Sequence, residues 1–559
     1  MRVASEPSQA SAATLIVAGL LVGIAAWLLP ANLTSISPAL LRTAGAGSAS
    51  VAAFGRQLVQ GEKLGPAQLV LATARAVRDP GASGLEKDLT TLAAQQPGLA
   101  VWGGWDPFLD PILKRPGGPE RGESTPVLTL ILPQDARATL LDYLKSSRSL
   151  GVQSLLRLRS LERTGRFVPA TQPGGQPLEA TILLSALLYQ GEHVSPALQR
   201  EIRGLSDTAL AEGRLGELEF FLMDLLSLSR RLDWVQLSEL LRRTDSTHTV
   251  GEYAHLARVA PEQLPLIYTA ALFSDSSDRV ATYLIRYGKN GLADLTLALG
   301  DGQAAVTQLL LRQVPVNHGP SRGIEAAAGL VLLHPKLMLA LKYLGYLLGA
   351  FLLLRGLDRW IVREAGGGPL LHLRSGALAL LFSALLVVAS EPFLLKAAPP
   401  SEFRQRLVLP VLVATSAQPP ASPNKTVTTM DSSTLLSIGL FASLQVAMYL
   451  FCLLKIREIA RSSFPPLLKL RLMENEENLF DGGLYVGIGG TATALVLQVL
   501  GIIEPNLLAA YSSNLFGIAC VALVKIRHVR PYKRELILES QIAAAPTPVV
   551  APAASTATS

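Results

Sequence analysis

Residues 483–530 read GLYVGIGGTATALVLQVLGIIEPNLLAAYSSNLFGIACVALVKIRHVR. This stretch holds two apolar runs, 483–503 and 507–524, and the second run stops at a basic segment, 525–530. Each run is close to the roughly 20 residues that cross the hydrocarbon core of a bilayer. Because only the short turn 504–506 joins them, the two runs are predicted to form a tight helical hairpin in a membrane.

The composition also points to a membrane protein. Of 559 residues, 49% are hydrophobic and only 17% are charged, and the apolar residues gather into runs. The net charge is +7, but the basic residues cluster at the ends of apolar runs, where they orient membrane helices. We therefore expect the lipid bilayer, and no nucleic acid, as a partner. The two cysteines, Cys452 and Cys520, lie in apolar runs and are predicted to be small packing groups.

Four further runs extend the pattern. Residues 1–30 contain an apolar run without a clear small-x-small cleavage site, which favours an uncleaved signal anchor over a cleaved signal peptide. Three more runs cover 337–357, 375–395 and 434–454. Together with the hairpin they predict an all-α, polytopic membrane protein with about six transmembrane helices.

Residues 31–325 are predicted to form a large, mostly helical extracytoplasmic domain. Ser195-Pro196 and Asp233 are helix-start signals, and residues 216–232 carry a broad apolar face. That face comprises Leu218, Phe221, Leu222, Leu225, Leu226 and Leu228. Helices with short connections are typical of a solenoid, so a solenoid-like stack is one expected arrangement. A lone strand at 127–132 and a division of the domain near 116–125 are also expected.

The distribution of Lys and Arg predicts the orientation. Loops 355–374 and 455–482 and the tail 525–534 each carry four or five basic residues, and such segments stay in the cytoplasm. Loop 396–433 is expected outside, although it also carries four basic residues. The N- and C-termini are then cytoplasmic, and residues 31–325 are periplasmic or extracellular, which fits the inner membrane of a bacterial cell. The uncharged tail 541–559 is predicted to be disordered.

Small and hydroxyl-bearing residues recur in the hairpin at spacings that let helices approach closely. They serve either packing inside one subunit or a subunit interface or pore wall. The candidate residues are Gly487, Gly490, Thr491, Ser512, Ser513 and Gly517. Two carboxylates, Glu391 and Glu504, lie near the ends of apolar runs, where water is expected to reach them.

No motif of an enzyme stands out. Residues 487–492 match the dinucleotide pattern G-x-G-x-x-A, but they lie in an apolar run without the βαβ unit that the pattern requires. His248 and His255 lack a third nearby metal ligand. We therefore predict no catalytic, cofactor-binding or metal-binding residues and no enzymatic activity.

The hairpin resembles the last two spans of the MotA/TolQ/ExbB proton-channel family. Residues 487–494 are similar to that family's glycine-rich penultimate span, and 509–519 are similar to its final span. The resemblance implies that Thr491 and Ser512 or Ser513 face a central pore, opposite a partner helix that bears an Asp. It covers about 45 residues, and loop 455–482 is shorter than the family's cytoplasmic loop.

Two functions follow as hypotheses. In the first, the outer helical domain binds or scaffolds another envelope protein, and the apolar helices anchor it. In the second, the chain is a subunit of an ion-conducting or proton-motive-force-coupled complex. A homo-oligomer is one form that such a complex can take. A membrane enzyme is the weaker third class, because no polar cluster at a membrane face can be assembled from the sequence.

Overall fold

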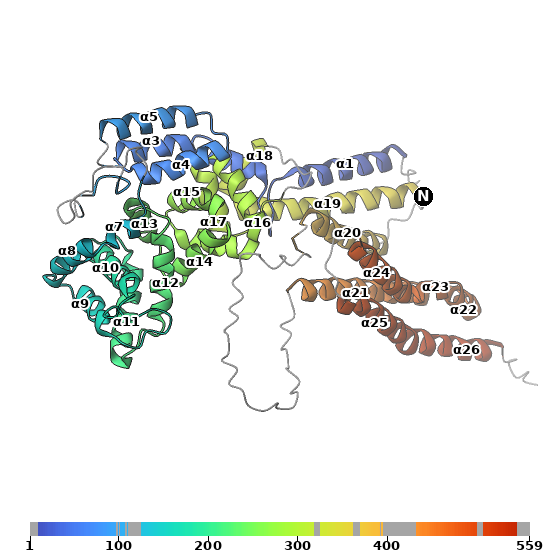
Figure 1. The fold of residues 1–559 in the computed structure, drawn as a ribbon. Helices are drawn as coiled ribbons and strands as arrows, with labels where there is room; N and C mark the ends of the chain where they lie inside the picture. Colours follow the sequence, from blue (N-terminus) through green and yellow to red (C-terminus); the bar gives the residue numbers. More distant parts are fainter. Residues whose placement is uncertain are drawn as a thin grey trace, which may run out of the picture. The chain divides into compact units, whose positions relative to one another are not determined.

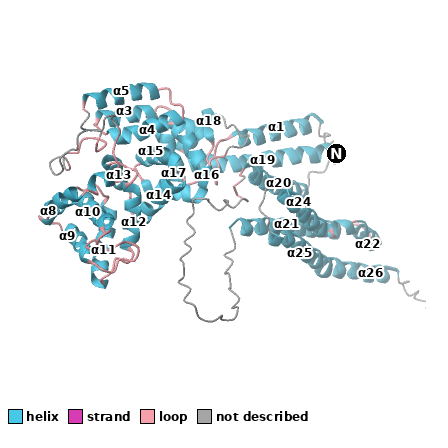
Figure 2. Ribbon diagram, in the orientation of Figure 1, coloured by secondary structure: helices cyan, strands magenta, loops and turns pink. Residues whose placement is uncertain are grey.

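The computed structural model describes residues 9–96, 99, 101–106, 109, 124–317, 325–361, 369–391, 393–394, 432–499 and 507–544. Its regular structure is helical, as predicted (Figures 1 and 2). Within these residues the only β-type pairings are two isolated bridges, Ile36 with Val316 and Arg163 with Arg214. The chain divides into two compact units: a helical domain built on Leu28–Leu339, and an apolar-helix unit built on Met1–Trp27, Ala340–Ala397 and Ala417–Ser559.

The helical domain begins and ends its helices at local signals in the sequence. Ser195 caps α11 with Pro196 in its first turn, and Asp233 caps α13 through a capping box with Gln236, which confirms both predicted starts. The helices are α2 (Pro38–Gly45), α3 (Val51–Gln60), α4 (Leu64–Ala76), α5 (Ala82–Gln95), α7 (Val127–Ile131), α8 (Gln134–Lys145), α9 (Leu150–Arg157), α10 (Gln176–Gln190), α11 (Pro196–Glu212), α12 (Leu218–Ser229), α13 (Trp234–Leu241), α14 (Thr247–Val259), α15 (Leu264–Ser274), α16 (Ser277–Asp301), α17 (Gln303–Arg312) and α18 (Glu325–Leu333).

One hydrophobic core runs through this domain. Helix α15 is apolar on all sides and every residue except Pro265 is buried, as expected of a central helix. Helix α4 packs against α15, and α2 packs against α17 and α18, so the start of the domain contacts its end. The expected solenoid is therefore wrong, because in a solenoid each unit contacts only its neighbours.

Two local predictions in the domain also change. The lone strand expected at 127–132 is helix α7. Its sequence is a short apolar run, and such a run has no hydrophobic periodicity that would distinguish a strand from a helix. The expected division near 116–125 falls mostly on residues outside the described ranges, and the residues on both sides of it share one unit. Helix α16 is interrupted by a kink at Gly288, where the backbone is not helical (φ 57°, ψ −135°).

The apolar-helix unit contains the predicted hairpin and two helices that lie along each other. Its helices are α1 (Gln9–Leu28), α19 (Pro335–Ile361), α20 (Pro369–Ser390), α21 (Ser432–Arg461), α22 (Pro466–Asn475), α23 (Glu477–Phe480), α24 (Gly482–Val499), α25 (Leu507–Val524) and α26 (Arg530–Ala544), with a π-helical turn at Lys525–Val529. Helices α1 and α19 approach closely: a Cβ added to Gly19 would lie 2.7 Å from the Gly349 carbonyl oxygen. Small residues at this crossing allow the close contact.

The predicted number of six membrane helices is too high for the described residues. By length and composition two helices there qualify as candidate spans, Ser11–Leu28 and Pro335–Trp360, a property shared by signal sequences and buried core helices. In α20 the apolar stretch among the described residues is Leu378–Ser390. The described part of α21 runs into charged residues at 455–458, and α24 and α25 have 18 residues each, at the short end of the spanning range.

The predicted basic loop 455–482 and the C-terminal tail fold together. Helix α22 packs on α26, and a small core containing Met473, Phe480 and Leu536 lies beneath them. Lys525 Nζ is 2.7 Å from the Asp481 carboxylate, so acidic residues of the loop pair with the basic tail. Helix α26 continues to Ala544, so the first residues of the expected disordered tail are helical, and residues 545–559 lie outside the described ranges.

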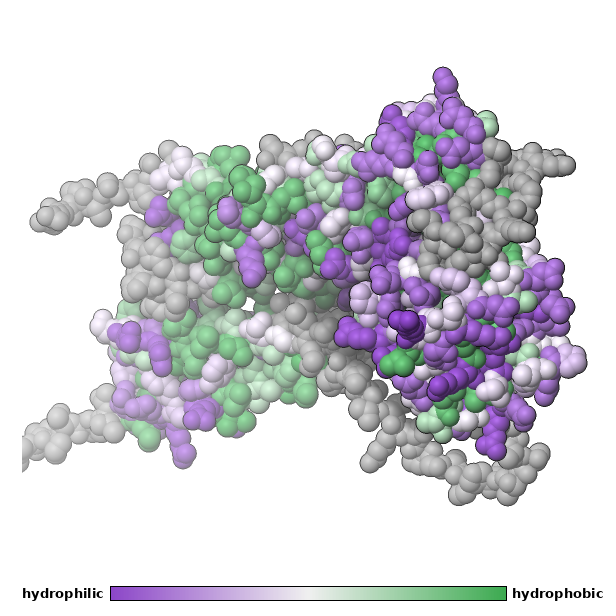
Figure 3. All heavy atoms as spheres, turned by 90° about the vertical axis from the view of Figure 1, so that its left-hand side faces the viewer, coloured by the Kyte–Doolittle hydropathy of each residue, from purple (hydrophilic) through white to green (hydrophobic). Residues whose placement is uncertain are grey.

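The two units expose different surfaces. In Figure 3 the nearer face, which belongs to the helical domain, is largely hydrophilic, whereas the fainter part that carries α1 and α19–α26 shows extended hydrophobic surface. Large apolar side chains of α1 and α19 are about half exposed or more, among them Val17, Leu21, Ile24, Leu337, Leu341 and Leu344. Contiguous exposed apolar surface of this kind marks interaction with a membrane or a protein.

Candidate functional site

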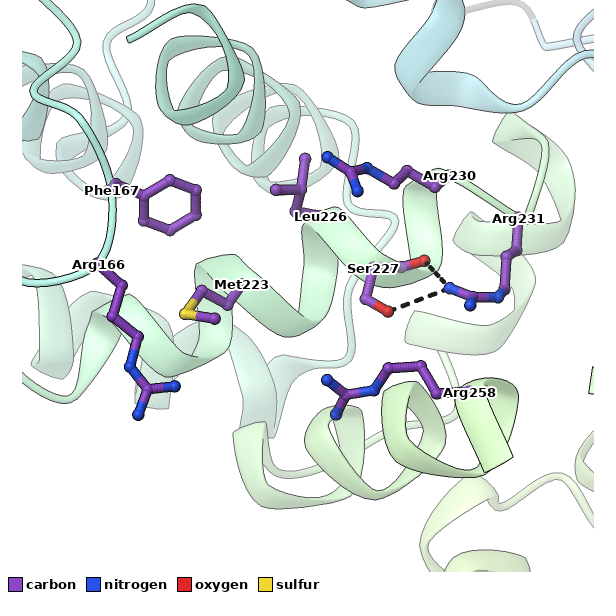
Figure 4. A pocket seen from close by; sticks show the side chains of 8 residues that line it. All are labelled: Arg166, Phe167, Met223, Leu226, Ser227, Arg230, Arg231 and Arg258. Carbon is purple, nitrogen blue, oxygen red and sulfur yellow. Dashed lines mark hydrogen bonds between the residues drawn. The ribbon is translucent and has the colours of Figure 1, made fainter. Parts of the chain in front are cut away.

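A groove rimmed by arginines lies on the helical domain where α12, α14 and the segment before α10 meet (Figure 4). We call it the basic groove. Its volume of about 670 Å³ lies within the range of roughly 300–1,000 Å³ that is common for ligand sites. It is lined by Arg166, Phe167, Met223, Leu226, Ser227, Arg230, Arg231 and Arg258.

An acidic residue in the first turn of α12 fixes one wall of the groove. The Glu219 carboxylate accepts hydrogen bonds from the backbone N–H groups of Arg166 and Phe167, the latter at 3.0 Å. The Arg166 guanidinium lies over the Phe220 ring, 5.2 Å from its centre. This cation–π contact adds to the backbone bonds, so Arg166 is held at the rim.

The opposite wall is built from α12 and α14. Arg231 Nη1 donates hydrogen bonds to the backbone oxygen and the hydroxyl of Ser227, at 3.0 and 3.2 Å. Arg258 Nη2 is 3.9 Å from Asp224, a loose ion pair. Burial raises the pKa of the Asp224 carboxyl, and the charge of Arg258 opposes this. The groove thus has four arginines, with the Glu219 carboxylate bound to backbone N–H groups at one wall and the Asp224 carboxylate loosely paired with Arg258 at the other.

The groove was not predicted from the sequence. Leu226 was predicted to lie on the core face of α12, whereas in the structure it is only partly buried, on the groove floor. The other five residues predicted for that face are buried. The available signal was a second repeat on α12: Met223, Leu226, Ser227 and Arg230 are spaced as residues i, i+3, i+4 and i+7, which share one helix face.

Four of the six candidate hairpin residues meet between α24 and α25. Ser513 is buried, and its hydroxyl donates a hydrogen bond to the Gly487 carbonyl oxygen at 3.3 Å. A Cβ added to Gly490 would lie 2.5 Å from the Ser513 Oγ, and one added to Gly517 would lie 3.2 Å from the Gly487 Cα. These are contacts of helix packing within one chain.

The remaining two candidates, Thr491 and Ser512, differ from these four in their contacts and burial. The Thr491 hydroxyl donates to the Gly487 carbonyl oxygen of its own helix at 3.0 Å, and Ser512 is partly buried. Sequence analysis missed Gln445 of α21, which is buried and donates through Nε2 to the Gly483 carbonyl oxygen at 3.1 Å. Gln445 thereby ties α21 to the hairpin. The pore role of these residues stays a prediction.

A buried pair of opposite charges lies between α19 and α20. Lys342 and Glu391 are both almost fully buried and interact electrostatically. The Tyr343 hydroxyl donates to Glu391 Oε1 at 3.4 Å. The expectation that water reaches Glu391 is wrong, because the side chains of α19 enclose it; Glu504 lies outside the described residues. An ionisable pair among apolar helices is a functional candidate.

A second polar cluster has a structural role. The Trp234 Nε1–H donates to Asp106 Oδ2 at 2.6 Å, and His193 Nε2 lies 3.2 Å from the same oxygen. Arg242 Nη2 is 2.6 Å from His193 Nδ1. A guanidinium can only donate, so His193 Nδ1 accepts and its proton lies on Nε2, facing Asp106. The cluster fastens the segment at 101–106 to α13.

The described residues contain no group of three or more His, Cys, Asp or Glu side chains arranged to hold a metal ion. His248 is largely exposed and lies 3.5 Å from Glu252. No protein-family model, no curated protein and no solved structure matches the chain.

Proposed function

We propose that this chain is a membrane-anchored scaffold whose helical domain binds another envelope protein. The observation that carries the proposal is the basic groove: a formed, positively charged cavity with an apolar floor on the helical domain. The exposed apolar side chains of α1 and α19 support attachment of that domain to a bilayer.

The proposed orientation keeps both termini in the cytoplasm and the helical domain on the outer side of the inner membrane. Pairing of Lys525 with Asp481 does not weaken this proposal, because orientation follows Lys and Arg near the span ends and acidic residues contribute little. Arg527, Arg530, Lys533 and Arg534 add to the basic cluster of the tail.

The test is the mass and composition of the complex that mild detergent extracts at native expression, combined with cross-linking. We expect a small complex with one envelope protein whose cross-links map to residues 31–325. A ring of several copies around a second protein with an acidic membrane helix would contradict the scaffold and support an ion-motor subunit.

A second candidate function, a subunit of an ion-conducting complex, is supported by the buried Lys342 and Glu391 pair. Substituting Glu391→Gln removes the charge with little change of shape. If the pair lies on an ion path, this variant in proteoliposomes loses flux and keeps the wild-type assembly. Unchanged flux would leave the pair as a structural contact.

A further inference from the structure

We propose that the basic groove binds an amphipathic acidic segment of the partner protein. Apolar side chains of that segment would pack on Phe167, Met223 and Leu226, and its carboxylates would pair with the rim arginines. This inference rests on the proposed function, since it names the chemistry by which the helical domain holds its partner.

The first support is that α12 has two separate faces. One face packs into the core through Leu218, Leu222 and Leu225, which are fully buried. The other presents Met223 and Leu226 toward the groove, where both stay partly exposed. Partly exposed Met and Leu on a formed surface suit a helix-in-groove contact, and Met adapts its shape to different side chains.

The second support is the placement of charge. In Figure 4 Arg166 lies on one side of Met223, and Arg230 and Arg258 lie on the other. Guanidinium groups form paired hydrogen bonds with carboxylates. Because these arginines flank an apolar floor and do not converge on one point, the groove suits carboxylates spread along a segment better than a single phosphate.

The third support is that the acidic stretch of this chain is already engaged. In the acidic residues at 474–481, Glu476 lies 3.7 Å from Lys455, and Asp481 lies 2.7 Å from Lys525. That stretch belongs to the apolar-helix unit and packs there with α26. This stretch is therefore not assigned to the groove, and the proposal places a segment of a second protein there.

The test uses the full chain in detergent and fluorescent synthetic peptides. One helical peptide of about 16 residues carries Leu at i, i+3, i+4 and i+7 spacing with Glu between them. A second replaces each Glu by Lys, and a third replaces each Leu by Ser. We expect binding of the first peptide only, and weaker binding at higher salt, which screens exposed charges.

Charge reversal in the groove supplies the decisive comparison. Arg258→Glu has a matched control in Arg203→Glu of α11: both arginines are 48% exposed, and each lies just under 4 Å from an Asp. We expect Arg258→Glu, and equally Arg230→Glu at the end of α12, to weaken peptide binding at least tenfold. Arg203→Glu should leave binding unchanged. Helical circular dichroism verifies that each variant is folded.

Three results would overturn the inference. These are no binding of the Glu–Leu peptide, equal loss in Arg203→Glu, or displacement of the peptide by soluble short-chain phosphatidylglycerol together with equal binding of the Ser-substituted peptide, which would indicate an anionic lipid site. If the extracted complex persists in Arg230→Glu while that variant fails to bind peptide, the scaffold function stands and the partner is held elsewhere. If the peptide binds but no complex is extracted, the groove's preference for acidic segments stands and the scaffold function is contradicted.

Discussion

Asp233 is both the helix cap that the sequence predicted for α13 and a buried ionisable group, whose removal from water is unfavourable. Its carboxylate Oδ1 accepts a hydrogen bond from the Gln236 N–H at 2.7 Å and so caps α13. Gly65 and Gly103 make room for it: a Cβ at Gly65 would lie 1.9 Å from Asp233 Oδ2. Burial raises the pKa of the Asp233 carboxyl to about 7. The capping hydrogen bonds favour the ionised carboxylate and so oppose this rise, but burial is the larger effect.

This raised pKa predicts the direction of a pH effect. Between pH 4 and 7 the folded protein keeps a proton on Asp233 that the unfolded chain releases, so stability falls as pH rises through this window and levels off above it. The shift from 3.8 to about 7 corresponds to on the order of 4 kcal/mol. Asp233→Asn, which retains a capping oxygen, should remove most of this fall.

The measurement is thermal unfolding of the full chain in detergent, followed by circular dichroism from pH 4 to 8. Asp245→Asn, at an exposed position, is the control and should keep the wild-type pH dependence. If Asp233→Asn melts with the same pH dependence as the wild type, the buried carboxyl is not the titrating group.

At the scale of the element, the contact between α24 and α25 makes a prediction with a control in the same helix. A Cβ at Gly487 would lie 2.9 Å from the Ser513 carbonyl oxygen, whereas nothing lies within 4 Å of one at Gly489. Gly487→Ala should lower stability by about 1–3 kcal/mol through overpacking. Gly489→Ala should be neutral or stabilising by up to about 1 kcal/mol through helix propensity.

Thermal stability of the detergent-solubilised protein, measured by fluorescence-detected gel filtration after heating, compares the two variants. An equal response would mean that α24 and α25 do not pack through Gly487. The same row of small residues would then be free for a subunit interface or a pore wall.

The elements that could be predicted from sequence are those with local causes. The caps at Ser195 and Asp233 depend on residues within one turn, and both are where the sequence predicted them. The strand predicted at 127–132 is wrong, because neighbours in the fold decide such a short apolar run. The basic groove was missed for a related reason: Phe167 reaches α12 through Glu219, 52 residues further along the chain.

At the scale of the whole molecule, the arrangement of helices depends on contacts that no local pattern reveals. The expected solenoid is replaced by a domain in which α4 meets α15 and α2 meets α17. Among the described residues two of the six predicted spans, α1 and α19, remain candidates, and α24 and α25 are at the short end of the spanning range. The chain divides into a helical domain whose face in Figure 3 is largely hydrophilic and a unit with exposed apolar helices.

That division leads to a prediction about sidedness. Because both native cysteines are buried, a maleimide that does not cross membranes should label the wild type weakly. Ser160→Cys places a thiol on the exposed surface of the helical domain, and Glu539→Cys places one on exposed α26. We expect labelling of Ser160→Cys in intact spheroplasts, and labelling of Glu539→Cys only after lysis, since basic residues near the C-terminus hold it in the cytoplasm.

The labelling experiment distinguishes an odd from an even number of membrane crossings between residues 160 and 539. The domain and α26 on opposite sides would require an odd number of crossings between residues 160 and 539, with α19 as one of them. Labelling of both variants in spheroplasts, or of neither, would place the two sites on the same side. An even number of crossings would follow, and the basic tail would then not set the orientation. If the domain proved cytoplasmic, the acidic segment that fits the basic groove would have to come from a cytoplasmic protein, and the scaffold would act on the inner face of the membrane.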